Sequence, residues 1–223
     1  MSGAQERKSP EMAALAAVAS GTIAPRRRKR RSAFEAGKLI LIVGPSGSGK
    51  DTLLLEARRH FSGNGNVIFC ERIITRSGEI GEKHVSVTEA EFENLATSGG
   101  FFLFWDAHGL RYGVPAEMLD ALQAGKTVIA NVSRRIIAEA RSKWPDTLIV
   151  NITANRDVLR ARLMARGRES AEAIEKRLER SVSADFPDDG SVEEIDNSGA
   201  VEPAAQRMIA IIASTLNASA ENG

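Results

Sequence analysis

The sequence predicts an α/β domain of three layers, in which helices cover both faces of a parallel sheet, and two observations carry this prediction. First, apolar segments of strand length alternate with segments of helix length through residues 38–216, an order typical of parallel sheets covered on both faces. Second, the apolar segment 38–43 is followed directly by GPSGSGKDT at residues 44–52. A glycine-rich loop at the carboxyl end of a first strand is a typical phosphate-binding element.

The elements of the first half are assigned from apolar runs and helix signals. In order, we expect a strand at 38–43, a helix at 51–60, a strand at 67–74, a helix at 88–97, a strand at 101–105 and a helix at 115–124. Thr88 and Glu91 have the spacing of a capping box. Pro115 suits the first turn of a helix, and Gly125 suits its end.

The second half continues the alternation to the end of the predicted domain. We expect strands at 127–132, 147–153 and 192–195, and helices at 133–143, 156–166, 171–183 and 202–216. The expected domain therefore spans residues 38–217, between a basic leader at 1–37 and a tail at 218–223. The sequence shows no internal repeat.

Composition is typical of one globular domain with an uneven charge. The 223 residues are 43% hydrophobic and 26% charged, with a formal net charge of +1. Residues 26–31 carry six positive charges, so the remainder sums to −5, which disfavours a general nucleic-acid binder. We interpret the leader as disordered; an electrostatic contact with an acidic partner or RNA is the alternative.

Cysteine usage and hydropathy point to a soluble, cytoplasmic protein. The one cysteine, Cys70, excludes an internal disulfide framework, and its apolar neighbours favour a core position. No apolar run approaches the roughly 20 residues of a membrane helix. The N-terminus also lacks the order of basic, apolar and cleavage regions found in signal peptides.

The glycine-rich loop predicts nucleotide binding. Its glycines let successive backbone N–H groups turn toward phosphate oxygens, the following helix adds the positive end of its dipole, and Lys50 supplies a mobile charge for the β- and γ-phosphates. A plain glycine-rich turn would not explain Lys50. The expected ATP-binding residues of the loop are Gly44, Pro45, Ser46, Gly47, Ser48, Gly49, Lys50, Asp51 and Thr52.

Asp51 stands where such loops usually have Ser or Thr, whose hydroxyl binds Mg²⁺. Mg²⁺ accepts carboxylate oxygen as readily as hydroxyl oxygen, so we expect Asp51 to be a metal ligand that makes ATP binding more dependent on Mg²⁺. The alternative is that Asp51 is only an acidic residue favoured at the start of a helix.

An arginine-rich segment after the strand at 147–153 predicts a lid over the phosphates. Arginines that close over a transferring phosphoryl group neutralise its charge and exclude water. A solvated helix face is the alternative, because exposed helices also carry such charges. The candidates are Arg160, Arg162, Arg166, Arg168, Arg177 and Arg180.

Four motifs in order, GPSGSGK, TR, YG and RLxxRGRES, make residues 38–215 similar to the guanylate kinase family. The resemblance implies a five-stranded parallel core, a small subdomain for the phosphate acceptor and a lid. It also implies that Arg76 and Tyr112 bind the acceptor phosphate and that Asn197, in DNSG, lies near the adenine. Arg166 and Arg177 would then hold the triphosphate together with Arg162. The catalytic candidates become Lys50, Asp51, Arg166 and Arg177.

The departures from that family concern recognition of guanine. Guanylate kinases read the base with carboxylates, but the corresponding segments FFLFW at 101–105 and ANVSRR at 130–135 contain no acid. The donors of guanine would be left unpaired, at about 1–3 kcal/mol each. Arg134 and His108 stand near these segments instead, and His84 stands roughly where that family has a tyrosine after the TR motif, which suits a small acceptor rich in phosphate. Plain solvent exposure is the alternative for either histidine.

GPSGSGKD, WxAHGLxYG and ARGRE together resemble the ribose 1,5-bisphosphate phosphokinases, relatives of guanylate kinase in phosphonate breakdown, in which Asp follows the loop lysine. The resemblance implies phosphorylation of ribose 1,5-bisphosphate by ATP with Mg²⁺ to give 5-phospho-α-D-ribose 1-diphosphate. A nucleoside monophosphate kinase and a guanylate-kinase-like binding module remain as alternatives. The expected partner is therefore a small phosphorylated sugar, with no membrane and no specific nucleic acid.

Overall fold

The computed structural model describes residues 36–76, 84–167, 170–180, 186 and 189–220. Most of the predicted leader, the last residues of the predicted tail and Arg168 of the predicted lid lie outside the described residues. The end of the helix predicted at 171–183 lies outside them as well.

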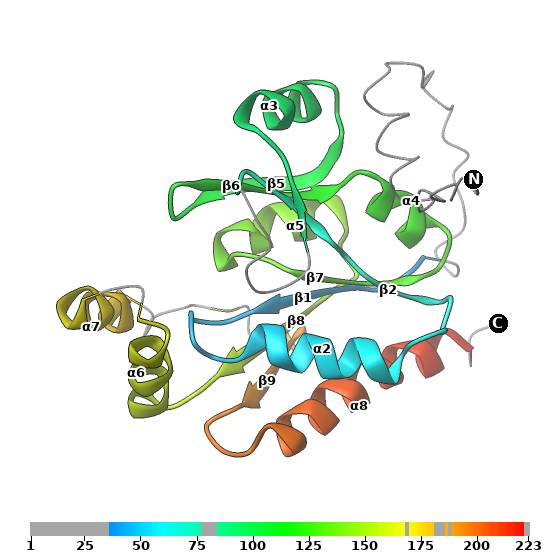
Figure 1. Ribbon diagram of the computed structural model, residues 1–223. Helices are drawn as coiled ribbons and strands as arrows, with labels where there is room; N and C mark the ends of the chain where they lie inside the picture. Colours follow the sequence, from blue (N-terminus) through cyan, green and yellow to red (C-terminus); the bar gives the residue numbers. More distant parts are fainter. Residues whose placement is uncertain (1–35, 77–83, 168–169, 181–185, 187–188, 221–223) are drawn as a thin grey trace, which may run out of the picture.

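Five parallel strands form the core sheet in the order β2-β7-β1-β8-β9, as expected (Figure 1). The strands are β1 (Leu39–Val43), β2 (Val67–Phe69), β7 (Thr127–Asn131), β8 (Thr147–Thr153) and β9 (Val192–Asp196). The central strand β1 is apolar and fully buried along its length, because both faces of a parallel sheet are covered.

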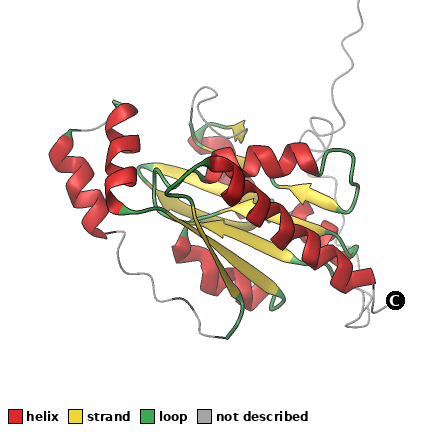
Figure 2. Cartoon of the chain, turned by 90° about the horizontal axis from the view of Figure 1, so that it is seen from below, coloured by secondary structure: helices red, strands yellow, loops and turns green. Residues whose placement is uncertain are grey.

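Helices and a second sheet cover the two faces of the core sheet. Helices α2 (Lys50–His60) and α8 (Val201–Ala220) pack on one face (Figure 2). Ile40, Ile42, Leu53 and Met208 belong to the core cluster on this face. The other face is covered by α4 (Glu117–Gln123), by a 3-10 turn, η2 (Arg134–Ile136), that leads into α5 (Ile137–Lys143), and by the second sheet.

The second sheet, called the small sheet below, has the order β4-β3-β6-β5. Its strands are β3 (Arg72–Ile74), β4 (His84–Ser86), β5 (Phe101–Ala107) and β6 (Leu110–Pro115). Helix α3 (Glu89–Thr97) packs on it, and Thr88 and Glu91 form the predicted capping box at the start of that helix.

The prediction of one strand at 67–74 was wrong. Residues 67–69 pair with β7 in the core sheet, whereas residues 72–74 pair with β4 and β6 in the small sheet. The backbone N–H of Cys70 still donates to Ile129 O at 2.8 Å, so the chain leaves the core sheet immediately after this residue. Both short segments are mostly apolar, β2 partly buried and β3 buried at Ile73 and Ile74, so the sequence pattern does not separate them.

The helix predicted from Pro115 was also misplaced, because Pro115 ends strand β6 and α4 begins at Glu117. The hairpin of β5 and β6 turns on His108 and Gly109, whose φ angles of 55° and 72° are both positive. Positive φ at both central residues is typical of the tight turns that join hairpins. Tyr112 and Gly113 of the YG motif lie in strand β6.

Helices α6 (Arg156–Ala165) and α7 (Ala171–Arg180), called the lid below, stand apart from the two main cores. They pack on each other through a separate cluster of Leu159, Leu163, Ile174 and Leu178. A pair of helices with its own small core is an arrangement suited to moving as one unit. No helix of the described residues is long and apolar enough to cross a membrane.

Candidate active site

Residues 44–50, called the phosphate loop below, comprise the loop after β1 and the first residue of α2, and two of these positions require glycine. Gly44 and Gly49 have φ angles of 145° and 89°. A Cβ atom on Gly44 would lie 2.2 Å from the backbone oxygen of Ile152, and one on Gly49 would lie 2.3 Å from Asn197 Nδ2. Both positions are thus closed to side chains by φ and by close neighbours.

Lys50 lies inside this loop rather than in solvent. Its Nζ donates hydrogen bonds to Gly44 O at 2.8 Å and to Pro45 O at 2.9 Å. The ammonium group is therefore held at the N-terminus of α2, where the helix dipole also favours an anion. This is the charge arrangement expected of a site for the phosphates of a nucleotide.

Two asparagines support the phosphate loop from outside it. Asn197 is buried, and its Nδ2 donates to Ser48 O at 2.7 Å; the sequence placed this residue near the adenine, whereas its observed contact is with the loop backbone. Asn131, at the end of β7, donates from Nδ2 to Asp51 Oδ1 at 3.3 Å. The exposed Asp51 carboxylate at the start of α2 is thus oriented by a neighbouring strand.

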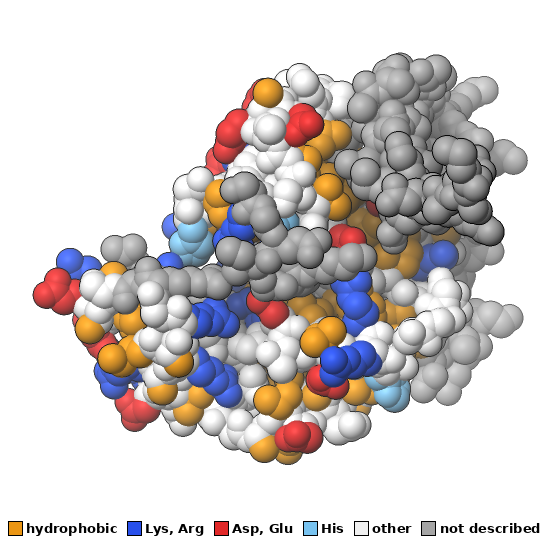
Figure 3. All heavy atoms as spheres, viewed as in Figure 1, with side chains coloured by type: hydrophobic (Ala, Val, Ile, Leu, Met, Phe, Trp, Pro, Cys, Tyr) orange, Lys and Arg blue, Asp and Glu red, His pale blue; other side chains and the backbone are white. Residues whose placement is uncertain are grey.

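Among the arginines predicted for the lid, Arg162 contacts the phosphate loop. Arg162 Nη1 donates to Gly47 O at 3.4 Å. Arg166 is exposed at the end of α6, and Arg177 is half-buried on α7. Lys and Arg side chains gather where the lid meets the rest of the molecule (Figure 3).

Arg160 serves the lid itself. Its guanidinium pairs with Glu175 on α7, and Arg156 pairs with the same carboxylate at 2.8 Å. Hydrogen bonds from Arg160, and then from Arg156, lower the pKa of the Glu175 carboxyl to about 2. The sequence grouped Arg160 with the phosphate-binding arginines, but its described contacts join the two lid helices.

On the small sheet, Tyr112 lies in a stack of three side chains. Its ring is parallel to that of Trp105, with centroids 5.5 Å apart and an interplanar angle of 8°. The guanidinium carbon of Arg72 lies 5.6 Å from the centre of the Tyr112 ring. Stacking on an aromatic ring fixes the plane of a guanidinium and attracts its charge.

The predicted histidines lie in different places. His84 is buried on β4, where it pairs in register with Arg72 on the parallel neighbour β3, so both side chains are on one face of the small sheet. His108 is exposed at the tip of the β5–β6 hairpin. Arg76 follows the end of β3 and is half-buried.

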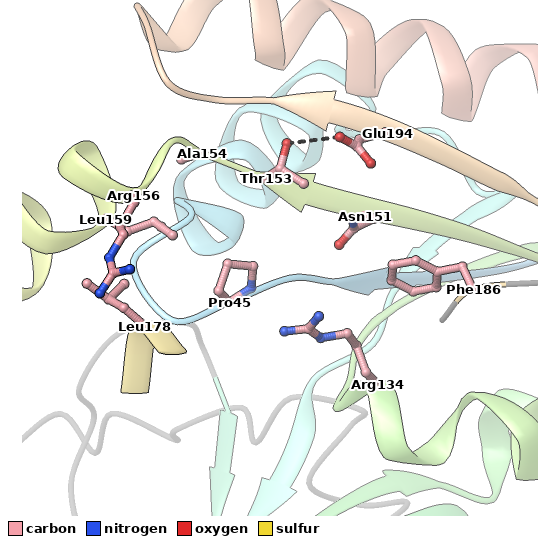
Figure 4. Close-up of a pocket in the computed structure, with 10 residues that line it drawn as sticks. All are labelled: Pro45, Arg134, Asn151, Thr153, Ala154, Arg156, Leu159, Leu178, Phe186 and Glu194. Atoms are coloured by element: carbon pink, nitrogen blue, oxygen red, sulfur yellow. Dashed lines mark hydrogen bonds between the residues drawn. The ribbon is translucent and has the colours of Figure 1, made fainter. Parts of the chain in front are cut away.

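Arg134, at the start of η2, lines a pocket of about 340 Å³ beside the phosphate loop (Figure 4). Pro45, Asn151, Thr153 and Glu194 are among the other residues that line it. Burial lowers the pKa of the Arg134 guanidinium, but an arginine stays charged in proteins. The pocket therefore has the Arg134 cation on one wall, polar side chains of β8 and β9 on the opposite wall, and Arg156 at its lid end.

Sequence reasoning missed Arg72, Asn131 and Asn151. The available signal was a polar residue within or next to an apolar strand: Arg72 interrupts the run at 67–74, and Asn151 interrupts the run at 147–153. Their neighbours in space come from other strands, so their roles could not be inferred from spacing along the chain.

A phosphate loop after the first strand of a parallel sheet, with its lysine in place and a lid carrying arginines, defines a phosphotransferase of the P-loop class. The family model described as guanylate kinase matches residues 36–187, and the chain belongs to the guanylate kinase family.

Comparisons with individual proteins make the relationship more specific. The chain is 47% identical over 182 residues to a protein of Rhizobium etli named ribose 1,5-bisphosphate phosphokinase PhnN, covering 80% of this chain and 90% of that protein. It is 43% identical over 185 residues to the protein of the same name from Agrobacterium fabrum, covering 81% and 99%.

A solved guanylate kinase from Anaplasma phagocytophilum is similar in fold. The two structures align with a TM-score of 0.56 at 20% identity, over 81% of this chain and 86% of that one.

Proposed function

We propose that the protein transfers the γ-phosphoryl group of ATP to the 1-phosphate of ribose 1,5-bisphosphate, giving ADP and 5-phospho-α-D-ribose 1-diphosphate. Its relatives in Rhizobium etli and Agrobacterium fabrum are named for a kinase of this substrate. The observation in the structure that carries the proposal is the cationic character of the acceptor side: Arg134 stands in the segment 130–135, where a base-reading kinase needs a carboxylate, and Arg72 stacks on Tyr112 of the small sheet.

The one acid of β5 faces the wrong way to read a base. Asp106 pairs in register with Arg111 and lies 3.4 Å from its guanidinium. Arg111 stacks over Phe92 of α3, with 4.5 Å to the ring centre. Asp106 is therefore turned toward α3, on the opposite face of the small sheet from Trp105 and Tyr112. Guanine would find no carboxylate from this strand.

The transfer itself is a displacement between two anions. An oxygen of the acceptor 1-phosphate attacks the γ-phosphorus in line, a new P–O bond forms, and the bond to the oxygen that bridges the β- and γ-phosphates breaks to release ADP. A phosphate oxygen is already ionised at neutral pH, so no general base is needed. Positioning and neutralisation of charge then supply most of the catalysis.

Different residues of this chain bind the donor and the acceptor. Lys50 binds β- and γ-phosphate oxygens, the backbone of the phosphate loop holds the triphosphate, and Arg162 approaches from the lid, with Arg166 and Arg177 brought in when the lid closes. On the acceptor side, Arg72, Arg76 and Tyr112 bind phosphate oxygens, and Arg134 neutralises the acceptor from η2. His84 lies beside Arg72, whereas His108 would reach a substrate only from the hairpin tip.

Asp51 fits a role in holding Mg²⁺. Its carboxylate is exposed beside the phosphate loop and oriented by Asn131, and Mg²⁺ is usually held by one or two carboxylates together with substrate phosphates. When bound, the ion would neutralise charge on the triphosphate. Among the described residues there is no cluster of three or more His, Cys, Asp or Glu side chains that would hold a metal independently of a nucleotide.

Identification of the product by phosphorus NMR tests the proposal. Purified full-length protein is incubated with ATP, Mg²⁺ and ribose 1,5-bisphosphate. We expect ADP and a new diphosphate on the anomeric carbon to appear at equal rates. ADP formation without that diphosphate, or no reaction, would contradict the proposal.

A further inference from the structure

Asn151 is a polar residue at a position that the fold makes apolar. It lies on β8 in register with Val43 of β1 and Glu194 of β9. Its neighbours Val150 and Ile152 point to the core beneath α2 and α8, while Ile149 on its own face belongs to the other core cluster together with Val43. The Asn151 side chain is only 7% exposed.

This position is costly for an amide. In the part of the chain that the structure describes, the buried Oδ1 of Asn151 has no hydrogen-bond partner. A buried acceptor without a donor costs about 1–3 kcal/mol, and an apolar side chain of similar shape would avoid that cost. A buried polar group that the fold leaves unsatisfied calls for an explanation, and functional sites are where such groups are expected.

The side chain points into the pocket that Arg134 lines from the opposite wall (Figure 4). The pocket is also polarised. On the β9 side, Glu194 accepts a hydrogen bond from Thr153 Oγ1 at 3.4 Å, so this end repels phosphate and accepts hydroxyl donors. On the η2 side, the Arg134 guanidinium attracts phosphate.

The chemistry of the unsatisfied atom selects the kind of ligand. A doubly ionised phosphate, the main form at neutral pH, has no proton to donate to Oδ1, whereas a sugar hydroxyl has one. A molecule with hydroxyls and phosphates on the same small ring matches both walls of the pocket.

We propose that Asn151 is a specificity-determining residue that accepts a hydrogen bond from a ribose hydroxyl of the acceptor while Arg134 binds one of its phosphates. This inference rests on the proposed function.

The test compares two substitutions on the same strand. Asn151→Leu removes the unsatisfied amide. Thr147→Val is its control, since Thr147 is 3% exposed on the same face of β8, and its Oγ1 is satisfied by the backbone oxygen of Trp144 at the far end of the strand. The thermal midpoint without ligand and the KM values for ribose 1,5-bisphosphate and ATP are measured for both full-length variants.

The inference predicts opposite patterns. Asn151→Leu raises the melting temperature, raises KM for ribose 1,5-bisphosphate about tenfold and leaves KM for ATP unchanged. Thr147→Val lowers the melting temperature and leaves both KM values unchanged. The wild type should also discriminate about tenfold against 2-deoxy- or 3-deoxyribose 1,5-bisphosphate, and Asn151→Leu should abolish that discrimination.

Other results overturn the assignment. If Asn151→Leu is less stable than the wild type and keeps its KM for the bisphosphate, Asn151 is only a structural residue. If the wild type phosphorylates GMP instead of the bisphosphate, the proposed function is wrong whatever the Asn151 variant shows. GMP binding to Asn151→Leu would then be measured by calorimetry. A loss of binding would show that Oδ1 accepts a hydrogen bond from the edge of the base and not from a sugar hydroxyl.

Discussion

The phosphate loop and the small sheet gather cationic groups in different ways. In the loop, seven consecutive residues at 44–50 hold the Lys50 ammonium between two backbone oxygens of the same loop. On the small sheet, Arg72, Tyr112 and Trp105 come from three different strands and meet only through strand pairing. The donor half of the site is therefore a local structure, whereas the acceptor half exists only in the completed fold.

The largest expected effect is at Lys50. Lys50→Ala removes the charge at the β- and γ-phosphates, and kcat should fall about 10³-fold because a charge that stabilises the transition state is lost. Steady-state assays of the variant and the wild type measure this fall in kcat. Lys143→Ala is a matched control, since the Lys143 ammonium binds Phe102 O and Glu139 away from the loop. Comparable losses in the two variants would contradict the role of Lys50.

Arg72 tests the acceptor half with a similar pair. Arg72→Gln should raise KM for ribose 1,5-bisphosphate about 10- to 100-fold, which corresponds to losing a hydrogen bond between charged groups, and should leave KM for ATP unchanged. Arg111 also stacks on an aromatic ring, but toward α3 and paired with Glu93 at 2.7 Å. Arg111→Gln should therefore leave both KM values as they are. Initial-rate kinetics on the two variants decide between these outcomes.

These two halves were predictable to different degrees. The loop, the alternation of strands and helices and the capping box of α3 follow from local patterns, because their residues are neighbours along the chain, whereas the five strands of the core were implied by the family resemblance. The small sheet was largely missed: β4 has only three residues, and β3 was merged with β2 because both are apolar. The contacts of Arg72 and Asn151 depend on long-range strand pairing, for which one sequence contains no local signal.

Asp51 is the point at which the donor half depends on a neighbouring strand. Asp51→Asn should raise the Mg²⁺ concentration for half-maximal rate about tenfold, since a lost ligand or its support typically weakens metal binding by that order. Asn131→Ala keeps the carboxylate and removes the hydrogen bond that orients it, so it should shift the titration less. If the Mg²⁺ titration of Asp51→Asn is unchanged, Asp51 is not a metal ligand and is only an acidic residue favoured at the start of a helix.

The smallest effect concerns the lid. The pKa of Glu175 lies near 2, below its usual 4.5, so its ion pairs stabilise the fold above pH 4.5 and lose that contribution as the pH falls toward 2. The pair is exposed, so Glu175→Gln should lower the melting temperature only slightly at pH 7, and the difference should vanish near pH 2. Glu172→Gln on the same helix is the control. A difference that persists at pH 2 would point to packing instead of charge.

The central claim is that an intact donor site faces an acceptor site built for a small polyanion and not for a nucleobase. Turnover of ATP with ribose 1,5-bisphosphate, GMP and AMP, each at the same concentration in parallel reactions, tests it most directly. We predict rapid turnover with the bisphosphate and little with either nucleotide. Turnover of GMP equal to or faster than that of the bisphosphate would contradict the claim.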